Sequence, residues 1–285
     1  MCGSVNPYFA VKKLKEDDEE AFKEELESLK RLGSKEQPHL VKLLATYEQK
    51  GSYYLIFPWA DGGNLRHLWE KFPKPNITYQ DRKLPHWLIK AILGIAEGLR
   101  AIHTCELDKS TKNEMSYNTT DVKKKHGAHG DLKPENILWF QDPLLGDGVR
   151  IPMGELKITD FGLTSFHKSE TRVKFEPKGV SRTYCAPEFD VKGHISQKYD
   201  MWTLGCVLTE FVTWFLQGLP GLVYFEHSRE EPTVFKVDED CFFKKHKDSA
   251  MLKDSVKQVE YAILLVLSVP FLFVPLVTNT QLYQL

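Results

Sequence analysis

A loop near the middle of the chain holds three side-chain types that seldom gather for packing alone. They are an acid, a lysine and an amide, namely Asp131, Lys133 and Asn136 in the segment HGDLKPEN. A second acid, Asp160, opens the tripeptide Asp-Phe-Gly directly after a short apolar run. Carboxylate and amide oxygens are ligands that a hard cation such as Mg²⁺ prefers, and a lysine offsets the charge of an anion beside it. These residue types therefore indicate a chemical site.

Other short motifs flank this loop in a specific order. Upstream, Ala10-Val11-Lys12 ends in a lysine on a predicted strand, thirteen residues before Glu25 on a predicted helix. Downstream, Ala186-Pro187-Glu188 follows Asp160 by 28 residues. An isolated Asp-Phe-Gly is a weak signal, but the ordered set, in fitting strand and loop contexts, is far more specific.

The hydrophobic pattern predicts the elements that must position these residues. Strands are predicted where branched and aromatic residues gather between turn residues, and helices where apolar residues recur every three or four positions. The predicted strands are 8–14, 39–47, 53–57, 137–140 and 156–158. The predicted helices are 22–32, ended by Gly33, then 85–103 and 201–215. Pro58 and the pair Gly62-Gly63 break the pattern and mark a hinge.

Composition narrows the class of protein. The 285 residues, 42% hydrophobic and 27% charged, suffice for one large two-lobed domain. A net charge of −1 argues against a protein that wraps nucleic acid. The five cysteines are scattered and form no C-x-x-C pair, which argues against a disulfide scaffold and favours a reducing compartment. The first twenty residues hold no apolar run suited to a signal peptide, so we expect a cytoplasmic protein.

With these motifs in order, the chain resembles the eukaryotic protein kinase family over residues 8–260. The segment HGDLKPENILWF also resembles the corresponding segment of a divergent serine/threonine-kinase-like group common in fungal genomes. The resemblance implies an α+β, bilobal protein-kinase-like fold. A partial, β-rich N-lobe with helix C and hinge would cover 1–60. A larger, mainly helical C-lobe would cover 61–260, with an insertion at 105–126.

The resemblance also implies roles in transferring the γ-phosphoryl group of ATP to protein hydroxyls, a reaction that depends on positioning and charge neutralisation. Asp131 would be the catalytic base and Lys133 would lie near the γ-phosphate. Asn136 and Asp160 would bind Mg²⁺. Lys12 would hold the α- and β-phosphates, fixed by an ion pair with Glu25. In the hinge after Phe57, Pro58 and Ala60 would contact adenine. Asp200 would hold the backbone of the catalytic loop.

The implied partner is a protein substrate with a serine or threonine hydroxyl, because Lys133 and Ser181 are typical of the serine/threonine class. No nucleic acid partner is implied, and we expect a monomer. The sequence departs from the protein kinase pattern at three places that matter for activity. Gly130 replaces an arginine that usually pairs with a phosphorylated activation loop. No glycine-rich phosphate loop precedes Lys12. No arginine follows Arg229 to pair with Glu188.

These departures leave three alternatives: an active kinase, a catalytically impaired pseudokinase or scaffold, and a chain truncated at both ends. The segment 261–285, which carries no charged residue, leaves two more. As a helix, its apolar stretch 262–277 would be about 24 Å long, short of a hydrocarbon core of roughly 30 Å. It either tethers the protein to a membrane, with Lys253 and Lys257 on the cytoplasmic side, or follows a buried helix over 255–267.

Overall fold

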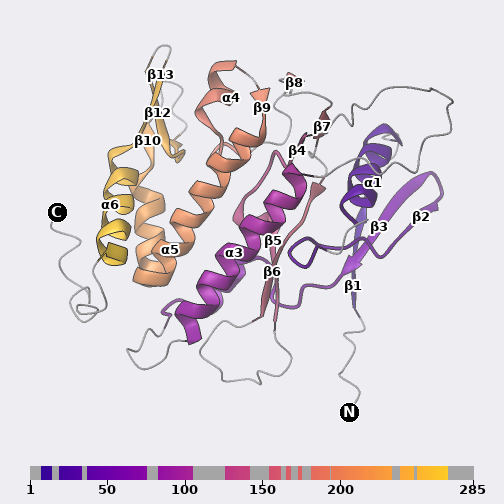
Figure 1. Ribbon diagram of the computed structural model, residues 1–285, viewed down its shortest axis with the longest axis horizontal. Coiled ribbons are helices and arrows are strands. Elements are labelled where there is room, and N and C mark those ends of the chain that lie inside the picture. Colours follow the sequence, from indigo (N-terminus) through magenta and orange to yellow (C-terminus); the bar gives the residue numbers. More distant parts are fainter. Residues whose placement is uncertain are drawn as a thin grey trace, which may run out of the picture.

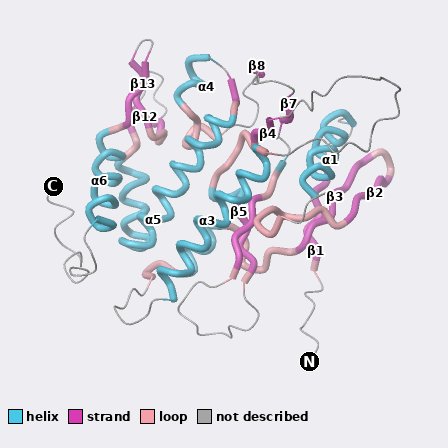
Figure 2. Tube along the Cα trace, in the orientation of Figure 1, coloured by secondary structure: helices cyan, strands magenta, loops and turns pink. Residues whose placement is uncertain are grey.

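The computed structural model describes residues 8–14, 19–33, 37–75, 83–104, 126–141, 154–161, 165–167, 173–174, 181–192, 194–232, 238–246 and 249–268. A small antiparallel sheet with one helix lies at one end of the molecule, and most of the helices lie at the other (Figure 1). Figure 2 shows the same division, with the three-stranded sheet on the right and the long helices in the centre and on the left. This arrangement confirms the predicted bilobal α+β fold.

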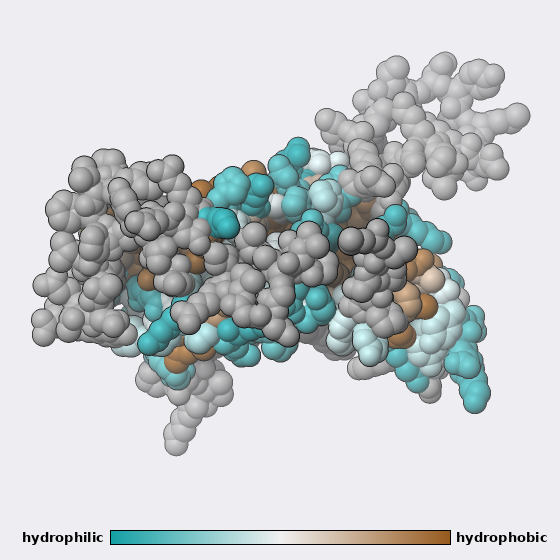
Figure 3. Space-filling view, turned by 90° about the horizontal axis from the view of Figure 1, so that it is seen from below, coloured by the Kyte–Doolittle hydropathy of each residue, from teal (hydrophilic) through white to brown (hydrophobic). Residues whose placement is uncertain are grey.

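The sheet consists of β1 (Phe9–Lys13), β2 (Ala45–Gln49) and β3 (Ser52–Pro58), in the order β1-β3-β2. Along β1 the side chains alternate, so that Ala10 and Lys12 are half-buried while their neighbours are exposed. Tyr8, Phe9, Val11, Leu44 and Tyr47 are among the exposed large hydrophobic residues at this end, where Figure 3 shows brown surface. The turn between β2 and β3 has positive φ at Lys50 (52°) and Gly51 (75°), as a two-residue hairpin requires.

Helix α1 (Glu19–Gly33) packs on this sheet through one stripe of its surface. Phe22 stacks on Tyr53 of β3 with ring centroids 4.3 Å apart, and Leu29 and Leu32 are buried. Glu25 lies three residues after Phe22 and four before Leu29, so it shares their face of the helix. The same periodicity that buries the apolar stripe therefore buries the Glu25 carboxylate.

The predicted strand 39–47 is wrong for its first half, because β2 begins only at Ala45. Residues 39–41 pair instead with β6 (Glu155–Ile158) of the helix-rich part. The Val41 N–H donates to the Ile158 carbonyl at 2.9 Å, and the Ile158 N–H donates to the His39 carbonyl at 2.9 Å. The segment 37–44 thus ties the sheet to the strand that precedes Asp160.

The helix-rich part contains α2 (Leu65–Lys71), α3 (Lys83–His103), α4 (Pro187–Lys192), α5 (Gln197–Ser228) and α6 (Asp254–Ser268). The predicted helices 85–103 and 201–215 are confirmed as α3 and the first half of α5. Among the described helices, α5 alone is long and apolar enough to cross a membrane, with a mean hydropathy of 1.3. Because 56% of that window is buried, α5 is the core helix of this part.

α5 bends where Gly218 adopts a φ of 73°. A side chain there would meet the Pro73 carbonyl at 2.5 Å, and the next residue, Leu219, donates its N–H to the same carbonyl at 2.8 Å. The bend therefore seats α5 on the chain just after α2. It also turns the second half of the helix so that Glu226 approaches α2.

Short strands complete the helix-rich part. The predicted strands 137–140 and 156–158 are confirmed as β5 (Ile137–Phe140) and β6, and the two strands pair with each other. β5 directly follows the short 3₁₀ helix η2 (Pro134–Asn136). The other pairs are β4 (His126–Ala128) with β7 (Ser165–His167), β8 (Val173–Lys174) with β9 (His194–Ile195), β10 (Glu231–Pro232) with β11 (Asp238–Glu239), and β12 (Phe243–His246) with β13 (Ser249–Leu252). One core cluster includes Leu29 and Leu55 from the sheet end together with Phe161 and Phe211.

A helix, α6, is present over the predicted range 255–267, but it is not the buried helix of the second tail alternative, because Val256 alone is buried among residues 254–265. The helix exposes Tyr261, Leu264 and Leu265. Residues 269–285, the rest of this tail, lie outside the described residues, as does nearly all of the predicted insertion at 105–126.

Candidate active site

Asp131, Lys133 and Asn136 converge within one loop. The Asn136 side-chain amide donates to the Asp131 backbone carbonyl at 2.8 Å and to Asp131 Oδ2 at 3.1 Å. Lys133 Nζ lies 2.7 Å from the same carboxylate oxygen. Asp131 is 8% exposed. The loop therefore holds one largely buried carboxylate between an ammonium and an amide.

Asp200 of helix α5 holds the backbone of this loop in place, and it is fully buried. Its carboxylate accepts the backbone N–H groups of His129 at 2.7 Å and Gly130 at 2.9 Å, and it lies 2.8 Å from His103 Nε2. These contacts confirm that Asp200 holds the loop backbone. Gly130 has a φ of 83°, a conformation that costs a side-chain-bearing residue about 1–2 kcal/mol, so glycine suits this backbone.

Lys12 joins three elements through its ammonium group. Its Nζ lies 2.8 and 3.0 Å from the two carboxylate oxygens of Glu25 on α1, and 2.9 Å from Asp160 Oδ1 after β6. The predicted pair between Lys12 and Glu25 is therefore present. Burial alone would lower the pKa of Lys12, but Asp160 and Glu25 outweigh it and the pKa is raised. The pKa of Glu25 is also raised, because its burial outweighs the attraction of Lys12.

Asp160 and Phe161 connect this cluster to the loop. Phe161 is 2% exposed and packs edge-on against His129, with ring centroids 5.9 Å apart. The Thr159 N–H donates to the Asn136 carbonyl at 2.9 Å, while the Thr159 carbonyl lies 3.0 Å from His129 Nε2. Asp160 itself has a φ of 63°, a left-handed conformation that aspartate tolerates better than most residues. The two acid-bearing segments are thus held in one unit.

The predicted hinge residues lie between β3 and α2. Pro58 ends β3, and the Ala60 carbonyl accepts the Gly63 N–H at 3.1 Å. The Gly62 N–H donates to the Trp139 carbonyl at 3.1 Å, and the Trp139 N–H donates to the Gly63 carbonyl at 2.8 Å. A Cβ on Gly62 would lie 2.3 Å from the Trp139 ring. Glycine is therefore required for the hinge to lie against β5.

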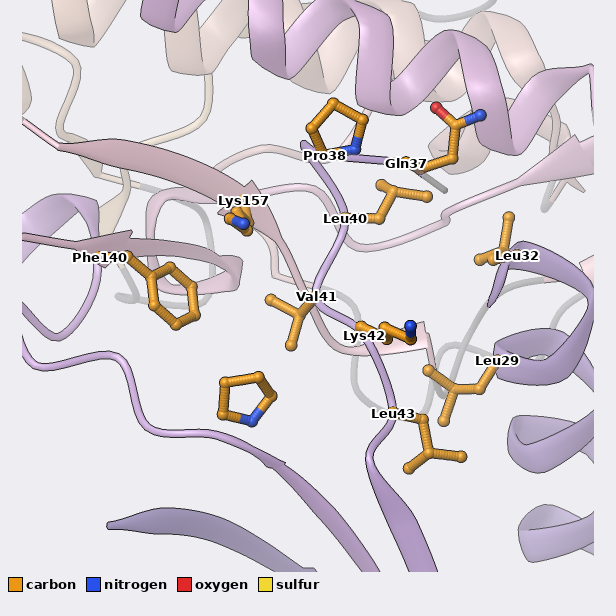
Figure 4. A pocket seen from close by; sticks show the side chains of 11 residues that line it. Leu29, Leu32, Gln37, Pro38, Leu40, Val41, Lys42, Leu43, Phe140 and Lys157 are labelled. Atoms are coloured by element: carbon orange, nitrogen blue, oxygen red, sulfur yellow. The ribbon is translucent and has the colours of Figure 1, made fainter. Parts of the chain in front are cut away.

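A cavity of about 550 Å³ lies between α1, the segment 37–43 and the pair of strands β5 and β6 (Figure 4). Leu29 and Leu32 of α1, Val41, and Phe140 and Lys157 of β5 and β6 contribute to its wall. Of the predicted site residues, only Pro58 lines it. Its mainly aliphatic lining indicates no chemistry of its own.

Sequence reasoning missed a second charged group that adjoins the loop. Arg66 of α2 binds Glu135, the residue before Asn136, and also contacts Tyr184 and Glu226. Because these partners are up to 160 residues apart in the chain, no local pattern could have revealed them. Of these residues, Glu135 alone belongs to the HGDLKPEN motif.

Glu188, for which the sequence offers no arginine after Arg229 as a partner, is only half-buried, and among the described residues none forms an ion pair with it. It is therefore not a fully buried acid left without a partner. The buried ion pair of this region is instead Glu210 with Arg229, 2.7 Å apart and both fully buried. Arg229, the last arginine of the sequence, thus serves a different acid.

Comparison with known proteins identifies the fold and the ordered motifs. The family model described as "Protein kinase domain" matches residues 4–257, most of the chain. The chain belongs to the eukaryotic protein kinase family. It is 27% identical to mouse cyclin-dependent kinase-like 5 over 203 residues, which are 70% of this chain and 18% of that protein.

Plant kinases give similar matches. The chain is 28% identical over 207 residues to the EPD1-interacting receptor-like cytoplasmic serine/threonine-protein kinase of Nicotiana benthamiana, covering 72% of this chain and 37% of that protein. It is 27% identical over 260 residues to the serine/threonine-protein kinase RUNKEL of Arabidopsis thaliana, covering 90% of this chain and 16% of that protein. The chain therefore spans well under half the length of these kinases. The fungal-type subgroup stays a prediction.

Proposed function

We propose that this chain binds Mg-ATP and transfers the γ-phosphoryl group to a serine or threonine hydroxyl of a protein. The observation that carries the proposal is the convergence of the two charged clusters. One gathers Glu25 and Asp160 on the Lys12 ammonium, and the other gathers Lys133 and Asn136 on Asp131. The hydrogen bond between Thr159 and Asn136 links them.

The donor set of Asn136 and Asp160 fits a magnesium ion. The Asn136 amide nitrogen is engaged with Asp131, which leaves its oxygen as the group suited to a cation. Asp160 is 46% exposed, so its carboxylate is accessible. The described residues contain no cluster of three or more His, Cys, Asp or Glu side chains that could hold a metal alone. This suits Mg²⁺, which keeps waters and phosphate oxygens among its ligands.

In the proposed reaction each residue has one task. Lys12, oriented by Glu25, binds the α- and β-phosphates, and the hinge at Pro58 and Ala60 takes the adenine. Asp131 accepts the proton of the attacking hydroxyl. Lys133 offsets charge on the transferred phosphoryl group. When bound, Mg²⁺ neutralises charge that develops on the phosphate oxygens.

The domain limits and location belong to the same proposal. The N-lobe would cover 1–60 and the C-lobe 61–260, with 261–285 as a tail that tethers the protein to a membrane or ends a cytoplasmic chain. Three of the cysteines, Cys185, Cys206 and Cys241, are free and buried, which suits a cytoplasmic protein. The chain would act as a monomer on a protein substrate.

The second candidate function is a pseudokinase or scaffold. One observation favours it: in the described part of the chain, β1 is an edge strand of the sheet. In the described residues, no further strand pairs with the free edge of β1, the strand that carries Lys12. A chain of this kind would bind a partner protein without turning over nucleotide.

Asp131→Asn distinguishes the two functions. The wild-type protein is expected to gain thermal stability with Mg-ATP and to produce phosphoserine or phosphothreonine on a generic protein substrate such as casein. Asp131→Asn should keep the thermal shift and lose turnover by about 10²–10⁴-fold, the usual contribution of a positioned base. If the wild-type protein neither binds nor turns over Mg-ATP, the kinase proposal is wrong for this chain.

A further inference from the structure

Arg66, in the first turn of α2, uses its guanidinium to join three separate elements. Nε contacts Glu135 of η2 at 2.5 Å, Nη1 contacts Glu226 of α5 at 2.8 Å, and Nη2 donates to the Tyr184 hydroxyl at 2.8 Å. Each acceptor therefore has its own donor. The ammonium of a lysine could not reproduce this planar, forked arrangement.

Tyr184 continues the connection into the core. Its hydroxyl accepts from Arg66 and donates to Glu210 Oε2 at 2.8 Å. Glu210 Oε1 in turn lies 2.7 Å from Arg229 Nη2. The Arg229 guanidinium carbon lies 4.3 Å from the ring centroid of Phe225 and 4.2 Å from that of Phe242. These contacts form a continuous chain of charge-assisted hydrogen bonds, which are stronger than neutral ones.

The environment keeps Arg66 and Tyr184, the two donors at the start of this chain of contacts, protonated. Burial by itself would lower the pKa of Arg66, but Tyr184 and the surrounding carboxylates outweigh it, and the pKa is raised. Burial, followed by the neighbouring Glu210, raises the pKa of the Tyr184 hydroxyl well above its usual value. Both donors therefore keep their protons at any physiological pH.

Two of the joined segments adjoin the proposed catalytic base. Glu135 lies four residues after Asp131 in the same loop. Tyr184 precedes Cys185 and Ala186, which pack against Ala128 just before His129. The segment 181–186 therefore lies against the start of the catalytic loop. The outer rim of the group is accessible beside that loop, since Arg66 is 32% and Glu135 40% exposed.

We propose that Arg66 is a positioning residue for the protein substrate, which fixes the segment 181–186 relative to the catalytic loop. This inference rests on the proposed kinase function and deepens it. The Arg66 contacts described above all lie in the helix-rich part, and none involves Lys12, Glu25 or Asp160. Arg66 therefore acts on transfer to the protein hydroxyl and leaves the binding of ATP unchanged.

Steady-state kinetics with Arg66→Met and Arg66→Lys test the proposal. Both variants are expected to lower kcat/KM for the protein substrate by about 10²-fold, as a small misplacement of reacting groups does. The KM for ATP should stay within about twofold, a change of under 1 kcal/mol. Arg100→Met is the matched control, since Arg100 is an exposed arginine of α3 whose side chain forms no ion pair among the described residues. It should leave all constants unchanged.

Two kinetic results would overturn the proposal. Recovery of the wild-type rate by Arg66→Lys would mean that the charge alone matters. An equal rise in the KM for ATP would mean a general loss of structure. If Arg66→Met does not fold, Tyr184→Phe removes only the central hydroxyl and keeps the ring packed near Phe242, 6.3 Å away. It should show the same selective loss, and unchanged kinetics in this variant would contradict the proposal.

Amide hydrogen exchange separates this inference from the proposed function. In Arg66→Met, peptides covering 129–137 and 181–186 should exchange faster than in the wild type, while α1 should be unchanged. If the wild-type protein shows no phosphotransfer, the proposed function fails. The exchange experiment still tests whether Arg66 fixes the segment 181–186 relative to the loop that contains Asp131. Unchanged exchange in both segments would overturn the role of Arg66 regardless of activity.

Discussion

Lys12 contacts two carboxylates whose surroundings differ sharply. Glu25 is 5% exposed, whereas Asp160 is 46% exposed. Burial raises the pKa of Glu25 from its ordinary value even though Lys12 lies beside it. The charge of Glu25, and with it the orientation of Lys12, is therefore sensitive to acid. An exposed glutamate in the same pair would stay ionised to lower pH.

The affinity for Mg-ATP should depend on pH through Glu25. As the pH falls through the raised pKa, Glu25 takes up a proton and loses the charge that holds Lys12. The ratio of wild-type to Glu25→Gln affinity should then fall toward one between pH 7 and mildly acidic pH. Titration of a fluorescent ATP analogue at each pH measures this ratio, and the comparison cancels protonation of the nucleotide itself. A ratio independent of pH would show that Glu25 does not orient Lys12.

The hinge and β5 meet at an element contact that leaves no space for a side chain. A Cβ on Gly62 would lie 2.3 Å from the Trp139 ring and 2.7 Å from its carbonyl oxygen. Gly62→Ala should therefore lower the free energy of unfolding by about 1–3 kcal/mol, as overpacking does, and weaken nucleotide binding.

Gly205→Ala is the matched control, since nothing lies within 4 Å of a Cβ on that exposed position of α5. It should raise the free energy of unfolding by about 0.5–1 kcal/mol, because alanine favours the helix. Urea denaturation measures both variants. Equal effects of the two substitutions would contradict the close contact.

Arg229, which directly follows α5, and Lys253, which follows β13, join α5 to the region of β12 and β13. Arg229 pairs with Glu210 and donates to the Asp240 carbonyl at 3.1 Å, while buried Lys253 donates to the Arg229 carbonyl. Glu210 is fully buried. Arg229→Met would leave the buried carboxylate of Glu210 without its charged partner. We therefore expect a loss of about 3–5 kcal/mol in the free energy of unfolding.

This loss should be smaller at pH 5.5 than at pH 8. Burial raises the pKa of Glu210, so the folded state binds this proton more readily than the unfolded state does. The stability from that proton is present at low pH and is lost as the pH rises through the folded-state pKa. Without Arg229 the pKa rises further and the effect grows. Urea denaturation of Arg229→Met and the control Arg100→Met at both pH values tests this. An equal deficit at both would contradict it.

At the scale of the whole molecule, the sequence predicts what local patterns encode. The periodic apolar residues of α1, α3 and α5 identify those helices, and the resemblance to protein kinases implies the pair of Glu25 with Lys12. The motif order identifies the family. Each of these inferences needs only residues that are neighbours on one element or that form a recognised motif.

Contacts between distant elements were not predictable in the same way. Residues 39–44 look like strand, yet 39–41 pair with β6 because that contact joins the two parts of the molecule. The chain from Arg66 to Arg229 uses residues from α2, η2, the 181–186 segment and α5. The short strands between 231 and 252 have no periodic pattern of their own. In each case the partner is set by tertiary packing, which a single sequence does not display.

The central claim requires both parts of the molecule, since Lys12 comes from the sheet and Asp160 follows β6. The most direct test is transfer of radiolabelled γ-phosphate from Mg-ATP to a generic protein substrate. Wild type and the control Lys90→Met, an exposed lysine of α3, should be active. Lys12→Met and Asp160→Asn should each lose about 10²-fold or more. Wild-type transfer that persists in both variants, or no transfer by the wild-type protein, would contradict the account.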